Sequence, residues 1–211
     1  MSLGGSLRAA AVDFYHQSWR LAVFNSILSA VALAVVYLTV FVSTGFAVLV
    51  LLLGPLAGAL MHCTVLLAQE DELRFRDGLA GLGLHWRRGL GLAAILLLVT
   101  VAGVVAIRFY GSEQWLLTIF VADVLAIFAV LQVFVWPRAI FQRDSPLYRV
   151  HADALSDFLA RPLTAFGFAL ALVVVNALGI AAGLMPFLTL TIAYSFLAAA
   201  HFALPRSPIR S

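Results

Sequence analysis

The sequence predicts an all-α fold: a polytopic membrane helix bundle of six transmembrane helices in three hairpins, each hairpin preceded by a cytoplasmic amphipathic helix. Three observations predict it: long apolar runs, few charged residues, and arginines that lie on one side of the runs with a single exception. Of the 211 residues, 64% are hydrophobic and 11% are charged. A soluble domain carries about 25% charged residues, so this chain needs lipid as its solvent.

Six apolar runs are each long enough to cross a bilayer, which takes about 20 helical residues. The runs are continuous, whereas barrel strands alternate between apolar and polar residues, so they predict helices. The predicted spans cover residues 21–42, 46–67, 90–107, 116–135, 163–182 and 187–204. The whole chain, 1–211, is therefore predicted to be a single transmembrane domain.

The arginines indicate how these spans are oriented. All of them except Arg108 fall before the first span, after the last, or in the two longer connections between spans. The positive-inside rule places that side, with both termini, in the cytoplasm. The formal net charge of +3 follows from this topology and gives no indication of a nucleic-acid partner.

The two longer connections predict short amphipathic helices on the inner membrane surface, over residues 69–88 and 145–161. In the second, Val150, Ala154 and Phe158 form an apolar face at helical spacing. Pro146 favours a helix start and Pro162 ends the helix before the fifth span. Aligning Asp77 with Asp153 reveals a repeat of four parts: amphipathic helix, span, short outer turn and span. A fainter copy begins near residue 8.

One acid lies inside a predicted span. Asp123 belongs to the fourth span, and ionisable groups at such depth are costly and are functional candidates by default. Arg108, on the same outer side, is its natural partner. We expect a structural Asp123–Arg108 pair rather than a proton relay, because a relay needs several titratable groups along one path.

Other polar residues in the spans favour structural roles. His62 and His201 are expected to be buried and hydrogen-bonded; a zinc site with Cys63 would need three or four converging ligands. Asn176 and Gln132 are expected to join helices, with a polar path as the alternative. No metal or cofactor is predicted. Small residues predicted to let helices approach closely are Gly54, Gly58, Gly179 and Gly183.

The charged residues of the two cytoplasmic helices are candidates for docking a partner, with a solvated helix surface as the alternative. The candidate docking residues are Glu70, Asp71, Glu72, Arg74, Arg76, Arg87, Arg88, Arg149, Asp157 and Arg161. The sequence contains no Walker A motif, nucleophile elbow, HExxH motif or paired catalytic carboxylates, so an enzyme is not expected.

Several segments together resemble a known family. They are GPLAGAL at 54–60, QEDE at 69–72, FRDGL at 75–79, HWRR at 85–88 and ALSDFLARPLT at 154–164. This series is similar to the YesL-like family of bacterial integral membrane proteins. The chain departs from that family at Gly78, where an aromatic residue is usual, and in having no lysine.

The resemblance implies a bacterial inner (plasma) membrane protein associated with carbohydrate ABC import systems, and it carries over no catalytic residues. Three functions follow in order of preference. The first is a non-catalytic accessory subunit of a membrane complex, whose partner is an ABC permease subunit or a second copy of the chain. The alternative is a small independent transporter or channel that uses Asp123 and other intramembrane polar residues. A membrane enzyme comes last.

Overall fold

Every element in the computed structural model is helical over the residues it describes, which are 3–70, 73–111, 113–183 and 185–205. None of these residues forms a strand. The α-helices are α1 (Leu3–Tyr37), α2 (Leu53–Glu70), α3 (Phe75–Tyr110), α4 (Trp115–Phe141), α5 (Leu147–Ala160), α6 (Pro162–Ala181) and α7 (Ile192–Ala203). Shorter helical segments of other geometry are η1 (Leu38–Val42), η2 (Thr44–Leu52) and η3 (Phe187–Thr191).

Among the described residues, five segments are long and apolar enough to cross a membrane, which agrees with the predicted multipass class. They are Trp19–Val42, Val48–Gln69, Phe75–Tyr110, Trp115–Phe141 and Pro162–Ala181. The remaining apolar helix, Leu188–Ala203, is shorter. Length and composition therefore support five crossings, and the sixth stays a prediction.

The structure differs from the sequence prediction at two junctions. The first lies within α1, which runs unbroken from Leu3 to Tyr37, through the fainter first copy of the amphipathic helix and into the predicted first span. At the second, we expected a cytoplasmic helix over 69–88 followed by a separate span over 90–107, but α2 extends to Glu70 and α3 runs unbroken from Phe75 to Tyr110. The junction residue is Gly89, which keeps its backbone N–H and lets the helix continue. At the matching place later in the chain, Pro162 does separate two helices: Arg161 has φ −150° and ψ 57°, because proline disfavours the helical region for the residue before it.

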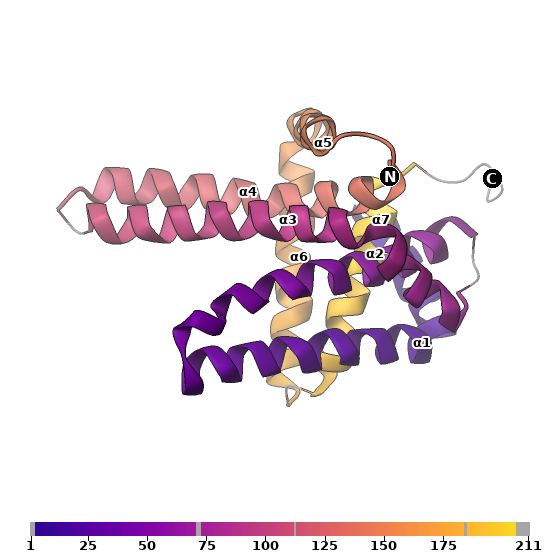
Figure 1. Cartoon of the computed structure of the whole chain (residues 1–211). Helices are drawn as coiled ribbons and strands as arrows, with labels where there is room; N and C mark the ends of the chain where they lie inside the picture. The colour runs from indigo at the N-terminus through magenta and orange to yellow at the C-terminus, as the bar shows by residue number, and fades with distance from the viewer. Residues whose placement is uncertain (1–2, 71–72, 112, 184, 206–211) are drawn as a thin grey trace.

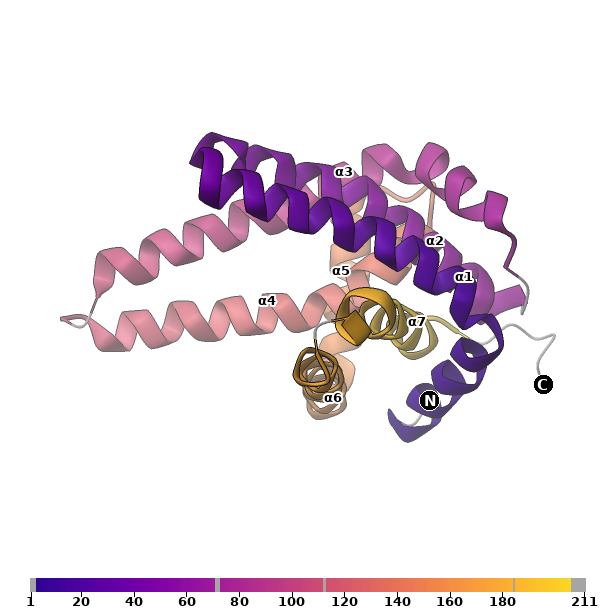
Figure 2. The same cartoon turned by 90° about the horizontal axis from the view of Figure 1, so that it is seen from below.

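The helices form three consecutive pairs, α1–α2, α3–α4 and α6–α7, which join at one end and separate toward the other (Figure 1). The α6–α7 pair runs across the direction of the α3–α4 pair. It is upright in Figure 1 and seen nearly end-on in Figure 2, whereas α3 and α4 lie along the page in both views. The pairs therefore diverge.

The core lies at the end where the pairs join. The central helix is α2, which contacts α1, α3, α4 and α7, and its Leu60 and Leu67 are fully buried. The buried residues of α4 all fall in its second half, between Val130 and Ile140. The end of the bundle where the pairs join, which we call the packed end, is thus the end where the arginines gather. The opposite ends of the pairs carry exposed apolar side chains.

Candidate functional site

Arginines at the packed end bind the ends of neighbouring helices. The half-buried Arg88 of α3 donates hydrogen bonds to the carbonyl oxygens of Ala139 (2.6 Å), Gln142 (2.7 Å) and Ser145. The last carbonyls of a helix lack partners within the helix, and a nearby cation satisfies them favourably. Arg88 therefore fixes the end of α4 and the connection that leads to α5.

A second group of charges joins α4, α5 and α7. Arg138 forms an ion pair with Asp157. The guanidinium carbon of Arg161 lies 4.8 Å from the centroid of the Phe202 ring, and its Nη2 donates to the Phe202 carbonyl oxygen at 3.4 Å. The Phe202 ring stacks in turn on Phe168, with centroids 4.1 Å apart. Arg161 thus lies on a cluster of core aromatic rings.

These contacts divide the residues that we expected to dock a partner. Arg88, Asp157 and Arg161 are partly buried and engaged within the chain, which the sequence could not reveal because their partners come from distant helices. The exposed members of the set are Arg74, Arg76, Arg87 and Arg149. The Arg74 backbone N–H donates to Asp77 at 2.7 Å, at the start of α3. The side chain of Glu70, together with Asp71 and Glu72, lies outside the described part of the chain.

A buried pair that the sequence analysis missed links the first helix to the last. Nε2 of His201 lies 2.8 Å from Oδ2 of Asp13, and the two side chains are 5% and 15% exposed. Near it, the Tyr194 hydroxyl donates to the Leu7 carbonyl oxygen at 3.1 Å. We had expected a hydrogen-bonded His201, and the only available signal for its partner was that Asp13 is the one acid before the first span.

The other intramembrane histidine packs against a third one. The His62 and His85 rings have centroids 5.0 Å apart, and Cys63, the residue after His62, is buried. Within the described ranges no three histidine, cysteine or acidic side chains come together as metal ligands.

Asp123 and Arg108 form no ion pair in the structure, and both side chains are exposed. In the α3–α4 pair, Leu125 faces α3: a Cβ placed on Gly103 would lie 2.6 Å from Leu125 Cδ1. Residues two apart on a helix point about 200° apart, so Asp123 faces away from α3. The expected pair is not formed because Asp123 points away from α3, the helix that carries Arg108.

Asp123 instead belongs to an exposed apolar stripe. Leu116, Phe120 and Ile127 lie at helical spacing around it and are 64%, 64% and 39% exposed. We call these four residues the α4 stripe. It combines a carboxylate with large apolar side chains that are partly or largely exposed.

Of the four glycines that we expected at helix contacts, two lie at the contact between α2 and α3. Gly54 of α2 lies directly against Gly89 of α3, and a Cβ placed on Gly58 would lie 3.7 Å from the Gly89 Cα, an ordinary contact distance. Gly179 is buried on α6. Gly183 has φ +113° and an open surrounding, so it serves the turn after α6 and not a helix contact.

Asn176 joins two helices, as we expected for a polar residue in a span. Its Nδ2 donates to Oγ of Ser195 at 2.7 Å, and Thr191 Oγ1 donates to its Oδ1 at 3.2 Å. Gln132 donates only within α4, to the Phe128 carbonyl oxygen at 3.4 Å. These polar side chains are therefore engaged in separate places.

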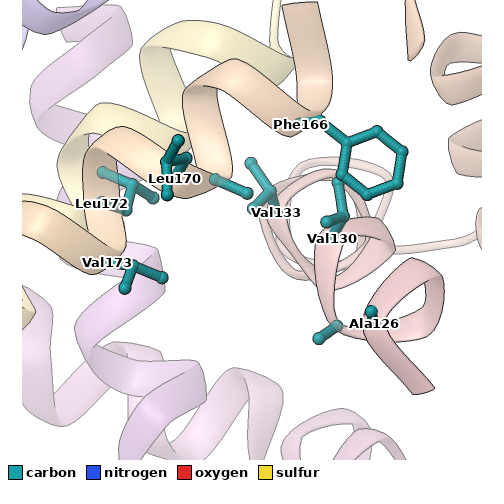
Figure 3. Close-up of a pocket in the computed structure, with 9 residues that line it drawn as sticks. Ala126, Val130, Val133, Phe166, Leu170, Leu172 and Val173 are labelled. Carbon is teal, nitrogen blue, oxygen red and sulfur yellow. The ribbon is translucent and has the colours of Figure 1, made fainter. Parts of the chain in front are cut away.

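Two hollows adjoin the second half of α4. A polar pocket of about 510 Å³ is lined by Arg138, Asp157, Arg161 and residues 202–205. An open groove of about 450 Å³ lies between α4 and α6 and is lined by apolar side chains (Figure 3). The chain thus carries two hollows of different character, one lined by charged side chains and one lined by apolar side chains.

Comparisons with protein-family models, curated proteins and solved structures give no match to this chain.

Proposed function

We propose that this protein is a non-catalytic subunit of a membrane complex and that it binds a membrane-protein partner through the α4 stripe. The observation that carries the proposal is Asp123, an exposed carboxylate on an apolar helix. A charged side chain in the hydrocarbon region is costly unless it faces a partner or a polar cavity. A basic or hydrogen-bonding group on a neighbouring helix would remove that cost.

The surroundings of Asp123 support a helix as the partner. Leu116, Phe120 and Ile127 extend the stripe over about three helical turns, and an amphipathic match of this kind is how helices recognise one another. The first half of α4 contains no buried residue, so this surface is available for assembly.

The orientation that we propose follows the arginines. The packed end, both termini and α5 lie in the cytoplasm, the turns near 43, 112 and 184 lie outside, and the chain crosses the membrane six times. The short apolar helix Leu188–Ala203 supplies the sixth crossing. The membrane is the bacterial inner membrane, as the resemblance to the YesL-like family implies.

The same resemblance suggests the partner, a permease subunit of a carbohydrate ABC importer. A second copy of this chain is the alternative partner. The proposal involves no nucleic acid and no cofactor. The exposed arginines Arg76, Arg87 and Arg149 are available on the cytoplasmic side for a second, weaker contact with the same complex.

A small independent transporter is less well supported. It needs Asp123, Asn176 and Gln132 along one path. Asn176 is instead bonded to Ser195 and Thr191, Gln132 is bonded within its own helix, and Asp123 lies on the exposed face of α4. Their separation favours assembly over transport.

The test is to purify the tagged full-length protein from its own host in mild detergent and to identify its companions by mass spectrometry. We expect stoichiometric permease subunits, and a loss of about ten-fold or more in their recovery for Asp123→Asn, the scale of a hydrogen bond to a charged group. The matched control is Glu113→Gln, the same chemical change at an exposed acid beside the outer turn.

Two results would contradict the proposal. Recovery of the wild-type chain as a monomer would remove the assembly role. Equal recovery of the partner with Asp123→Asn and with Glu113→Gln would remove the α4 stripe as the interface. Recovery of a homo-oligomer that Asp123→Asn disrupts would keep the stripe and replace the permease by a second copy.

A further inference from the structure

The helix α5 carries two apolar faces, although its sequence predicts only one. The predicted face is buried inside the protein and is therefore not available to lipid; it consists of Val150, Ala154 and Phe158. The second face is exposed and consists of Tyr148 (75% exposed), Leu155 (43%) and Leu159 (65%). We call these three residues the α5 stripe. Contiguous exposed apolar side chains of this size mark a contact with a protein or a membrane.

The α5 stripe lies beside the contact between α5 and α6. The Phe158 ring packs edge-on against Phe166 of α6, with centroids 5.6 Å apart, so the Phe158 side of α5 faces α6. Successive helical residues are rotated by about 100°, which places all three stripe residues on one flank of α5, about 60–100° from Phe158. Asp157 lies on the opposite flank, where it pairs with Arg138 of α4. The contact with α6 thus separates an apolar flank from a charged one.

The side of α5 that points away from α6 is polar. Arg149 and Ser156 are both exposed, and the helical rotation places them about 180° and 160° from Phe158. A helix with this arrangement can keep its polar side in water while its apolar flank lies in the interfacial region of a bilayer.

The direction of α5 agrees with a position along a membrane surface. The helix α6 is long and apolar enough to cross a membrane, and α5 lies across the end at which α6 begins. In Figure 1, α6 is upright and α5, above it, is seen nearly end-on. In Figure 2, α6 is the helix seen nearly end-on. Because α6 enters the bilayer at this end, a helix that lies across its start runs along the bilayer surface.

The exposed apolar surface of α5 continues onto α6. Leu163, in the first turn of α6, is 86% exposed and follows Leu159 by four residues. Leu170 and Val173 are exposed further along the same helix. Apolar side chains that a membrane-spanning helix leaves exposed contact the hydrocarbon of the lipid. The α5 stripe therefore adjoins a surface that lipid covers, which favours lipid over a separate protein as its partner.

We infer that the α5 stripe is a contact with the lipid surface, in which its side chains insert among the lipid headgroups beside the start of α6. Interfacial helices bury their apolar side about 5–10 Å into the boundary between headgroups and acyl chains. Tyr148 suits that level, because its ring is apolar and its hydroxyl is polar. The inference requires that α6 crosses the membrane; it requires neither the partner proposed for the α4 stripe nor a particular direction of crossing.

The test measures how deeply each side of α5 lies in a bilayer. Single-cysteine variants of the full-length protein are labelled with bimane and reconstituted in phosphatidylcholine vesicles. The label is quenched either by lipid that carries a nitroxide on the upper acyl chain or by iodide in the water. Leu155→Cys, in the α5 stripe, and Ser156→Cys, its exposed neighbour on the polar side, form the matched pair. We expect the nitroxide lipid to quench the label at 155 and iodide to quench the label at 156.

Leu163→Cys supplies the reference for a position in contact with lipid. Leu163 is the most exposed of the apolar residues near the corner between α5 and α6, and it belongs to the first turn of the membrane-spanning helix. Its label is expected to lose fluorescence to the nitroxide lipid to the same extent as the label at 155. Because all three substitutions are at exposed positions, the folded protein is expected to tolerate each of them.

Three results would overturn the inference. The first is equal quenching by the nitroxide lipid at 155 and 156. The second is a label at 155 that is shielded from both quenchers, since a protein surface would then cover the α5 stripe; shielding that fades as the protein is diluted in the vesicles would identify that surface as a second copy of the chain. The third is a label at 163 that the nitroxide lipid does not quench, because α6 would then not enter the bilayer at its start. Recovery of a membrane-protein partner through the α4 stripe is measured separately and depends on none of these results.

Discussion

Gly54 of α2 and Gly89 of α3 pack backbone against backbone. A Cβ placed on Gly54 would lie 2.6 Å from the Ala93 Cβ and 2.8 Å from the Gly89 carbonyl carbon. Only hydrogen atoms fit in that space. This contact holds the central helix against α3 at the position where the sequence had predicted a break in α3.

Replacing Gly54 by alanine is therefore expected to destabilise the fold. Neither neighbouring backbone can move without shifting its helix, and overpacking of this kind costs about 1–3 kcal/mol. Gly58→Ala is the control, because its new Cβ would meet its nearest neighbour at 3.7 Å. The measurement is reversible unfolding in detergent micelles, and equal stability of the two variants would contradict the close contact.

Arg88 and Arg87 offer a matched comparison of neighbours. Arg88→Ala removes three hydrogen bonds to carbonyl oxygens near the end of α4, and leaving such groups unpaired costs about 1–3 kcal/mol. Arg87 is exposed beside the Trp86 ring, so Arg87→Ala is expected to stay within about 0.5 kcal/mol. If both variants unfold at the same denaturant concentration, Arg88 does not fix the end of α4.

The Asp13–His201 contact is expected to couple the first and last helices. The variants Asp13→Asn, His201→Gln and their combination form a double-mutant cycle, with an expected coupling of about 0.5–3 kcal/mol for residues in direct contact. His16→Gln serves as the control, because His16 is exposed and its Nδ1 lies 2.8 Å from the Val12 carbonyl oxygen of the same helix. Additive single effects would show that the pair is not formed.

The proposed orientation can be measured by labelling single cysteines. The one native cysteine, Cys63, is buried and gives a low background. We expect Arg76→Cys and Arg149→Cys to react with an impermeant maleimide only from the cytoplasmic side, and Glu113→Cys only from the outside. Labelling of Arg149→Cys from the outside together with labelling of Arg76→Cys from the cytoplasm would place an odd number of crossings between these two residues and would refute the six-span topology.

The class of this protein could be predicted from its sequence because hydrophobicity and helix length act locally. A continuous apolar run forms a helix in lipid wherever its neighbours lie, because a helix satisfies its backbone hydrogen bonds within the segment. The break at Pro162 was predictable for the same reason, since the constraint acts between adjacent residues. The unbroken course of α3 was not, because Gly89 permits both a turn and a helix and the choice depends on its contact with Gly54.

The candidate site illustrates the same division. That Asp123 is an unusual charge was visible in the sequence, and that it faces away from Arg108 depends on which side of α4 packs against α3. Arg88 and Arg161 read as surface charges because their acceptors, the Gln142 and Phe202 carbonyls, lie more than forty residues away. The pairing of Asp13 with His201 spans nearly the whole chain.

The sequence by itself thus determined that the chain is helical, that it belongs in a membrane, and which end carries the positive charge, since composition and periodicity are properties of each segment alone. Only the tertiary structure decided which arginines are held inside, which face of α4 stays uncovered, and how the α6–α7 pair crosses the others. Those outcomes depend on backbone contacts and hydrogen bonds between segments distant in sequence, and no local pattern records them.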